Sequence, residues 1–223
     1  MVSDGYSEII RMSRLMHQRP MTFASSDGRH WGDGQGLLKA EPLICNLLEK
    51  YNTHSMLEVG AGRGLQLEPQ RWIDHVSNTL TAPMTIVERF GLDVYDQFDP
   101  AVPGIDHWPD QQYDCTVCIW VVGSILDQDF EWWLGQIAKR TTKFCFICGQ
   151  PAQSNIAPAN IAVNDAQILD YHKIIHSISS QRTEDFYRKI LSKYWTGPDL
   201  YYVHEIESAQ STDWMQQALI SNE

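Results

Sequence analysis

The sequence predicts an α/β fold with a mostly parallel central sheet and helices on both faces. Three observations favour this class. An apolar run at 56–59 ends directly in a glycine-rich turn at 60–64, as in the strand–turn units of parallel sheets. Further apolar runs at 115–122 and 143–148 have the β-branched and aromatic composition of strands buried on both faces. A segment of helical periodicity at 126–140 separates these two runs, as a connection between parallel strands requires.

Composition limits the classes of partner and location. The formal charge of −11 argues against binding of a nucleic-acid backbone, which requires Lys and Arg. No apolar run approaches the roughly 20 residues of a membrane span, and the N-terminal residues lack a basic-then-apolar signal pattern. Five cysteines, an odd number, suggest a reducing, cytoplasmic location without disulfides. The length suits one sizeable core, so we expect a single domain, residues 1–223.

The N-terminal part of the chain is predicted to contain two helices separated by a loop. Residues 1–18 have the pattern of a short amphipathic helix, and the polar, glycine-rich stretch at 24–36 is typical of a loop. We assign residues 1–40 to a cap made of this helix and loop. The next helix is expected at 37–51, with Pro42 in its first turn.

Residues 56–64 read MLEVGAGRG and carry the strongest functional signal in the chain. Glycines let a backbone approach a ligand closely, and a helix that follows the turn would offer unpaired N–H groups. The spacing is E-x-G-x-G-x-G rather than the G-x-G-x-x-G of dinucleotide sites, and Glu58 inside the strand is suited to hold an amino group. The alternative is an ordinary tight turn. The pattern resembles motif I of the class I S-adenosyl-L-methionine (SAM) methyltransferases, which implies a Rossmann-like sandwich and SAM as cofactor.

The resemblance extends over roughly residues 30–153 to a group of bacterial and phage methyltransferase-like proteins. In that group Y-D-P-x-x-P closes the second strand and F-D-x-V-x-C opens the fourth; this chain has FDPAVP at 98–103 and YDCTVC at 113–118. The resemblance implies that Asp99 holds the ribose hydroxyls, since one carboxylate matches two vicinal hydroxyls. Glu88 is the alternative for that role, because it also follows an apolar run. For either acid, a surface position without function stays open.

In parallel α/β sheets the ligand lies beyond the carboxyl ends of the strands. The first strand and its turn would therefore seat the methionine portion of SAM, the second strand the ribose, and the end of the fourth strand the adenine or the donor sulfur. The implied cofactor-binding residues are Glu58, Gly60, Ala61, Gly62, Gly64, Asp99, Pro100, Ile119 and Trp120.

The end of the fourth strand departs from the family pattern. Relatives that methylate commonly have D-V-L-E-H there, whereas this chain has WVVGS at 120–124. The change removes the obvious general base, so no catalytic residue is assigned. Methyl transfer from a sulfonium can still proceed when the acceptor is already nucleophilic, because the enzyme then mainly supplies alignment and desolvation. We interpret His107, in a short segment that forms an abbreviated third strand or a loop, as a surface imidazole.

Two C-x2-C pairs, Cys115/Cys118 and Cys145/Cys148, have the spacing of a zinc site. Both pairs lie in predicted strands, where residues i and i+3 point to opposite faces. Neither pair can bind one ion without breaking its strand. We therefore expect core packing of these thiols and no metal site.

The C-terminal part is predicted to complete one domain. Residues 150–180 are polar and punctuated by proline, which suits either a lid over the substrate or an inserted helix pair. We interpret the pair His172 and His176 in this segment as interfacial rather than metal-binding. An amphipathic helix capped by Thr183, a late strand within 198–208 and a short terminal helix follow.

These features predict SAM-dependent methyl transfer to a small-molecule or saccharide-like acceptor. Three alternatives stay open: a SAM-binding fold with a non-methylating activity or a catalytically silent regulatory role, a different nucleotide-binding protein that uses NAD, and a pure interaction module. A protein partner or a homo-oligomer is compatible with each.

Overall fold

The computed structural model describes residues 2–18, 35–69, 73–74, 79–149, 182–204, 206 and 213–220. Its strands are β1 (Ser55–Val59), β2 (Ile73–Asp74), β3 (Thr79–Leu80), β4 (Val94–Phe98), β5 (Tyr113–Ile119), β6 (Thr141–Cys148), β7 (Asp199–Val203) and β8 (Leu219–Ile220). Its α-helices are α1 (Asp4–Gln18), α2 (Gln35–Tyr51), α3 (Ile86–Phe90), α4 (Phe130–Ala138), α6 (Glu184–Tyr194) and α7 (Trp214–Ala218). Short 3-10 turns are η1 (Leu65–Leu67), η2 (Val122–Ser124) and η3 (Asp127–Asp129).

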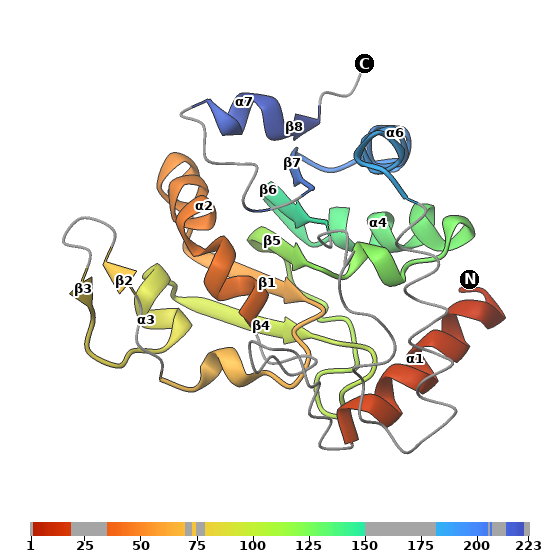
Figure 1. Cartoon of the computed structure of the whole chain (residues 1–223), viewed down its shortest axis with the longest axis horizontal. Coiled ribbons are helices and arrows are strands. Elements are labelled where there is room, and N and C mark those ends of the chain that lie inside the picture. The colour runs from red at the N-terminus through yellow and green to blue at the C-terminus, as the bar shows by residue number, and fades with distance from the viewer. Residues whose placement is uncertain are drawn as a thin grey trace, which may run out of the picture.

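Six strands form the central sheet in the order β4-β1-β5-β6-β7-β8 (Figure 1). The pairings from β4 to β7 are parallel, and β8 adds an antiparallel edge. The α/β class and the mostly parallel sheet are therefore confirmed. Because β1 has β4 on one side and β5 on the other, the strand order reverses at β1, and the crevice beyond such a reversal is where open α/β sheets bind ligands.

Helices cover both faces of the sheet. One apolar cluster joins α2, α3 and α7 to inward side chains such as Val117 and Phe146. The other joins α4 and α6 to neighbours on the opposite face, including Cys118 and Ile147. Figure 1 shows α2, α3 and α7 on one side of the sheet and α1, α4 and α6 on the other. Alternation along the strands thus builds two cores on one sheet.

The cysteine pairs are split between these two cores, as predicted. Cys115 and Cys148 pack on the α2 side, whereas Cys118 and Cys145 pack on the α4 side, and all four are buried and form no disulfide. Burial raises the pKa of each of the Cys115, Cys118 and Cys145 thiols well above its usual range. Within the described ranges no three His, Cys, Asp or Glu side chains are grouped as metal ligands.

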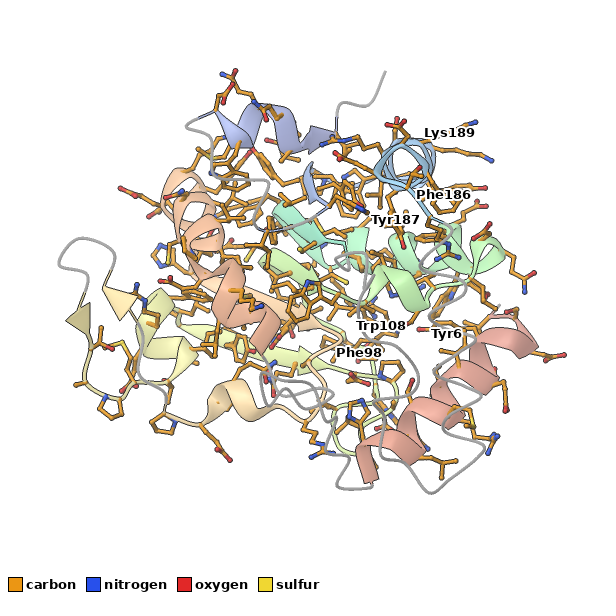
Figure 2. The ribbon with its side chains drawn as sticks, viewed as in Figure 1. Tyr6, Phe98, Trp108, Phe186, Tyr187 and Lys189 are labelled. Carbon is orange, nitrogen blue, oxygen red and sulfur yellow. The ribbon has the colours of Figure 1, made fainter. Side chains whose placement is uncertain are left out.

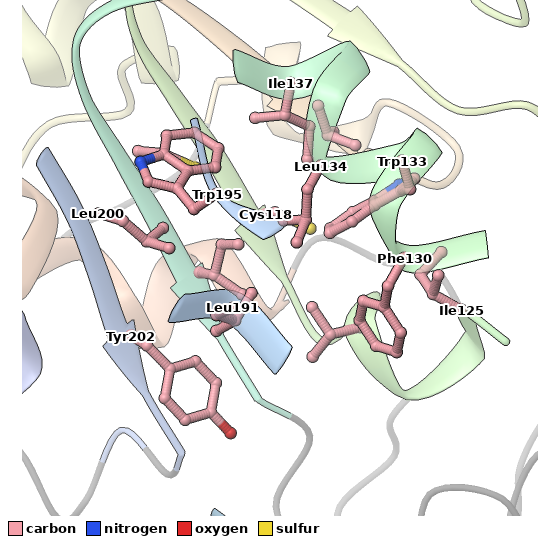
Figure 3. Close-up of a cluster of buried hydrophobic side chains, with 14 of the residues drawn as sticks. Cys118, Ile125, Phe130, Trp133, Leu134, Ile137, Leu191, Trp195, Leu200 and Tyr202 are labelled. Atoms are coloured by element: carbon pink, nitrogen blue, oxygen red, sulfur yellow. The ribbon is translucent and has the colours of Figure 1, made fainter. Parts of the chain in front are cut away.

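The C-terminal elements follow the predicted plan. The helix predicted at 126–140 is α4, and four of its side chains are buried beneath it: Phe130, Trp133, Leu134 and Ile137 (Figure 3). Thr183 caps α6, because its side chain accepts a hydrogen bond from the Phe186 N–H at 3.2 Å. The late strand is β7, and the edge strand β8 was not predicted.

The prediction for Pro42 is wrong. α2 begins at Gln35, within the segment assigned to the N-terminal cap, so Pro42 lies in the helix interior. The proline removes one backbone hydrogen bond, but Leu37 and Ala40 before it are fully buried and hold the additional turn against the sheet.

Several predictions fall outside the described residues: the glycine-rich loop before residue 35, and the lid at 150–180 with His172 and His176. No helix in the described part of the chain is both long and apolar enough to cross a membrane.

Candidate functional site

The carboxyl ends of β1, β4 and β5 bring the predicted site residues together. Val59, the last residue of β1, is paired with Phe98 of β4 and with Cys118 of β5. Gly60 and Asp99, which follow Val59 and Phe98 in the chain, therefore leave the sheet at the same edge at which Ile119 ends β5. The backbone N–H groups that open the turn, those of residues 60 and 61, both donate to the Phe98 carbonyl, at 2.7 and 3.3 Å.

The turn conformation requires glycine. Gly60, Gly62 and Gly64 have φ values of +80°, +60° and +71°, in the left-handed region. A Cβ on Gly60 would lie 2.0 Å from Cγ2 of Val121, and one on Gly64 would lie 2.7 Å from Oε1 of Gln97. The tail of β5 and the end of β4 therefore close tightly on the turn.

The α-helix predicted after the turn is absent from residues 65–69. The chain forms the 3-10 turn η1 instead, with hydrogen bonds from Gly64 N to Ala61 O and from Leu67 N to Gly64 O, each at 3.2 Å. Pro69 disfavours helical geometry in the residue before it and so limits the turn. Any ligand here would meet the N–H groups of the glycine turn rather than a helix N-terminus.

Asp99 lies directly against the glycine turn. Its Oδ2 accepts a hydrogen bond from Gly62 N at 2.9 Å, and its Oδ1 accepts one from Ala101 N at 2.8 Å. The residue is only 7% exposed, and burial raises the pKa of its carboxyl although the nearby His17 opposes this. Each carboxylate oxygen can still accept a further hydrogen bond. Asp99 thus braces the turn and retains free acceptor capacity.

Glu88, the alternative to Asp99, caps its own helix. Its Oε2 accepts hydrogen bonds from the N–H and hydroxyl of Thr85 at 2.7 and 3.0 Å, and its own N–H donates to Thr85 Oγ1 at 3.2 Å. This reciprocal arrangement is a capping box at the start of α3, and these hydrogen bonds lower the pKa of the Glu88 carboxyl. The apolar run before Glu88 belongs to a helix start rather than to a strand end.

Glu58 is enclosed by donors from its own chain. It is 4% exposed; Oε1 accepts a hydrogen bond from Gln66 Nε2 at 2.9 Å, and Oε2 accepts from the Tyr95 hydroxyl and, at 3.4 Å, from Gln97 Nε2. Burial raises the pKa of its carboxyl. No Lys, Arg or His in the described ranges forms an ion pair with Glu58. The site therefore holds a buried acid without a countercharge from these residues.

Ile119 and Trp120 complete the edge at the end of β5. Trp120 has φ +60°, a conformation that is rare and strained for a bulky side chain. A Cβ on Gly36, at the start of α2, would lie 2.8 Å from Ile119 Cγ2 and 3.1 Å from Trp120 Cε3. The indole Nε1 is buried without a hydrogen-bond partner among the described residues. Lys39 Nζ lies 5.7 Å from the ring centroid.

The predicted cap, α1, covers the loop after β4. Arg14 donates from Nη2 to the Pro100 carbonyl at 3.2 Å and to Asp106 Oδ2 at 3.3 Å. One turn further, burial lowers the pKa of His17 while the charge of Asp99 opposes this, so the imidazole lies within electrostatic range of that acid. Pro100, expected at the cofactor, contacts α1 through its carbonyl instead.

The segment after Asp99 is a loop, one of the two forms expected for it. Phe98 and Trp108 stack with ring centroids 3.8 Å apart and hold this loop against the sheet (Figure 2). The His107 side chain is 91% exposed and its Nδ1 lies 3.0 Å from Asp106 Oδ1, so its interpretation as a surface imidazole is confirmed.

Sequence reasoning missed Gln66, Tyr95 and Gln97. The two β4 residues share the strand face of Glu58 by simple alternation, since Gln97 is directly paired with Glu58 in the register. That signal was readable in the sequence. Gln66 lies in a turn without periodicity, and no sequence pattern indicates its burial.

This chain matches no protein-family model, no curated protein and no solved structure.

Proposed function

We propose that the protein binds SAM at the carboxyl ends of β1, β4 and β5 and transfers its methyl group to a small-molecule or saccharide-like acceptor. The hydrogen bond between Gly62 N and Asp99 Oδ2 at the strand-order reversal is the observation that supports this best. It joins a glycine turn, which a ligand can approach closely, to a carboxylate whose oxygens can each accept a further hydrogen bond. In this proposal the fold is a class I methyltransferase sandwich and the protein is cytoplasmic.

The polar groups of the site suit a ligand with a cation at one end and hydroxyls at the other. Glu58 is a buried carboxylate that lacks an ion pair within the described ranges, and it is suited to an ammonium group. The remaining lone pairs of Asp99 are suited to vicinal hydroxyls. The face of Trp120 is suited to a sulfonium through cation–π attraction. SAM carries all three groups.

When bound, SAM supplies an electrophilic methyl group on its sulfonium. The residues of this chain would orient the ligand and exclude water, through the turn backbone, Asp99 and the tail of β5. Residues 120–124 contain no carboxylate or imidazole that could accept a proton. The acceptor must therefore arrive as a competent nucleophile, or be activated by a group outside this tail.

A second candidate is a SAM-binding protein that does not methylate. The engagement of Glu58 and Asp99 by the protein's own donors favours it, because both acids already have structural partners. The absence of an acid or imidazole at 120–124 points the same way.

Calorimetric titration with SAM, S-adenosylhomocysteine and NAD tests the shared part of both candidates. We expect saturable binding of the two adenosyl ligands and none of NAD; preference for NAD would exclude both. Transfer of labelled methyl groups from SAM to a panel of amines, thiols, phenols and sugars then separates methyl transfer from silent binding.

A further inference from the structure

Gln66 carries a buried acceptor without a partner at the base of the glycine turn. The residue is 3% exposed, and its Nε2 donates to Glu58 Oε1 at 2.9 Å and to the Ala61 carbonyl at 3.1 Å. Its Oε1 is buried and has no hydrogen-bond partner in the described part of the chain. Buried polar atoms are nearly always paired, so an unpaired one requires an explanation.

The orientation of the amide follows from its neighbours. A backbone carbonyl can only accept hydrogen bonds, so the NH2 group must face Ala61 O. Reversing the amide would place oxygen against the carbonyl oxygen and also remove the donor to Glu58. The lack of a partner for Oε1 therefore does not arise from a reversed side chain.

The neighbourhood of this atom offers acceptors and negative charge. The Glu58 carboxylate and the Ala61 carbonyl both contact Nε2 of the same amide, and Glu58 has no ion pair with the described residues. A hydroxyl from a ligand would satisfy Oε1 but would leave the carboxylate without a countercharge. A primary ammonium satisfies both, because it carries three N–H donors and a positive charge.

We propose that Gln66 is a ligand-positioning residue whose Oε1, together with Glu58, binds the primary ammonium of an amino-acid portion of the ligand. The inference rests on the proposed function, since SAM and S-adenosylhomocysteine carry this group. Gln66 would give the site specificity for the intact amino-acid tail over adenosyl ligands that lack the amine. Burial raises the pKa of the Glu58 carboxyl, and a bound cation would act against this effect by favouring the charged form.

The test is a thermodynamic cycle of binding affinities, in which one group is removed from the protein, one from the ligand, and then both together. Gln66→Met keeps the length of the side chain and removes the amide, and the analogue of S-adenosylhomocysteine without its α-amino group removes the ammonium. For the wild-type protein we expect the analogue to bind on the order of 10- to 100-fold more weakly by calorimetry. We expect Gln66→Met to weaken the binding of S-adenosylhomocysteine by a similar factor and to leave the affinity for the analogue unchanged, because the amide and the ammonium act together.

Gln111→Met is the matched control. Gln111 also makes two side-chain hydrogen bonds, to Asp96 Oδ2 at 2.6 Å and to the Tyr113 hydroxyl at 2.9 Å, but it precedes β5 at the opposite edge of the sheet. Its replacement should leave both ligand affinities unchanged.

The outcomes separate this inference from the proposed function. No binding of S-adenosylhomocysteine by the wild-type protein overturns the proposed function and the inference with it. Binding that Gln66→Met leaves unchanged overturns the inference alone. Equal weakening of both ligands makes Gln66 a structural brace of Glu58 and also overturns it. If the variant does not fold, the wild-type protein still decides, because equal affinity for the two ligands contradicts an ammonium site.

Discussion

The Gly62 N–H donates to Asp99 Oδ2 at 2.9 Å, so the turn after β1 and the loop after β4 form one hydrogen-bonded unit. The second oxygen of Asp99 accepts from Ala101 N at 2.8 Å, within the loop itself. The acid that the sequence indicated as a ribose ligand is thus also a structural residue. A substitution here acts on the stability of the site as well as on its ligand.

Asp99→Ala leaves two buried backbone N–H groups without an acceptor. We expect it to lower the free energy of unfolding by roughly 2–6 kcal/mol, at about 1–3 kcal/mol for each buried group left unpaired, and to abolish adenosyl-ligand binding. Urea unfolding followed by tryptophan fluorescence measures the first effect. Asp93→Ala, at a side chain that is 82% exposed, is the control and should change stability by less than about 0.5 kcal/mol. Equal stability of the two variants would show that the loop does not need Asp99.

Glu58→Gln should change the pH dependence of stability. Burial raises the folded-state pKa of Glu58 above its ordinary value of 4.5, so the contribution of this group is fully present below that pH and is lost as the pH rises through the folded pKa. The free energy of unfolding of Glu58→Gln relative to wild type should therefore increase with pH from 4.5 upward, as measured by urea unfolding across a pH series.

Glu88→Gln is the matched control, and its stability relative to wild type should change with pH in the opposite direction. Hydrogen bonds from Thr85 lower the folded-state pKa of Glu88, so its contribution is present above 4.5 and is lost as the pH falls through the folded pKa. The relative stability of this variant should fall with rising pH. The same trend in both variants would contradict the burial of the Glu58 carboxyl.

Gly60→Ala tests how closely the tail of β5 packs on the turn. Its Cβ would meet Val121 Cγ2 at 2.0 Å, in addition to the strain of φ +80°. Gly91→Ala is the control, since Gly91 has φ +63° and nothing lies within 4 Å of a Cβ there. We expect urea unfolding to show that Gly91→Ala lowers the free energy of unfolding by about 1–2 kcal/mol and that Gly60→Ala lowers it by at least about 3 kcal/mol. Similar costs would mean that residues 120–124 move aside freely.

The strand cysteines should be unreactive in the folded protein. All four are buried, and burial raises the pKa of the partly buried Cys45 thiol to about 12. We expect a thiol reagent at pH 8 to label the protein only at the rate of its unfolding, and a metal chelator to leave the melting temperature unchanged. Fast labelling of a strand thiol, or a lower melting temperature with chelator, would contradict core packing.

Local patterns predicted the parts of the site that depend on local geometry. The glycine spacing indicated a turn that requires positive φ at Gly60, and strand alternation placed Cys115 and Cys118 on opposite faces. The interior position of Pro42 was missed because tertiary packing before it outweighs the proline penalty. The polar partners of Glu58 were missed because side-chain hydrogen bonds to a buried acid depend on distant segments; Gln66 reaches it from a turn and Tyr95 from a neighbouring strand.

The attachment of α1 has a consequence for synthesis of the chain. Ser3 donates to Asp129 through its N–H and its hydroxyl, at 2.9 and 2.6 Å, across 126 residues of sequence. On the ribosome, the apolar side of α1, with Tyr6, Ile9 and Met12, must stay undocked until the start of α4 has left the exit tunnel. A nascent fragment that stops before Asp129 would present this side to chaperones and proteases, and quality control should therefore remove such fragments quickly.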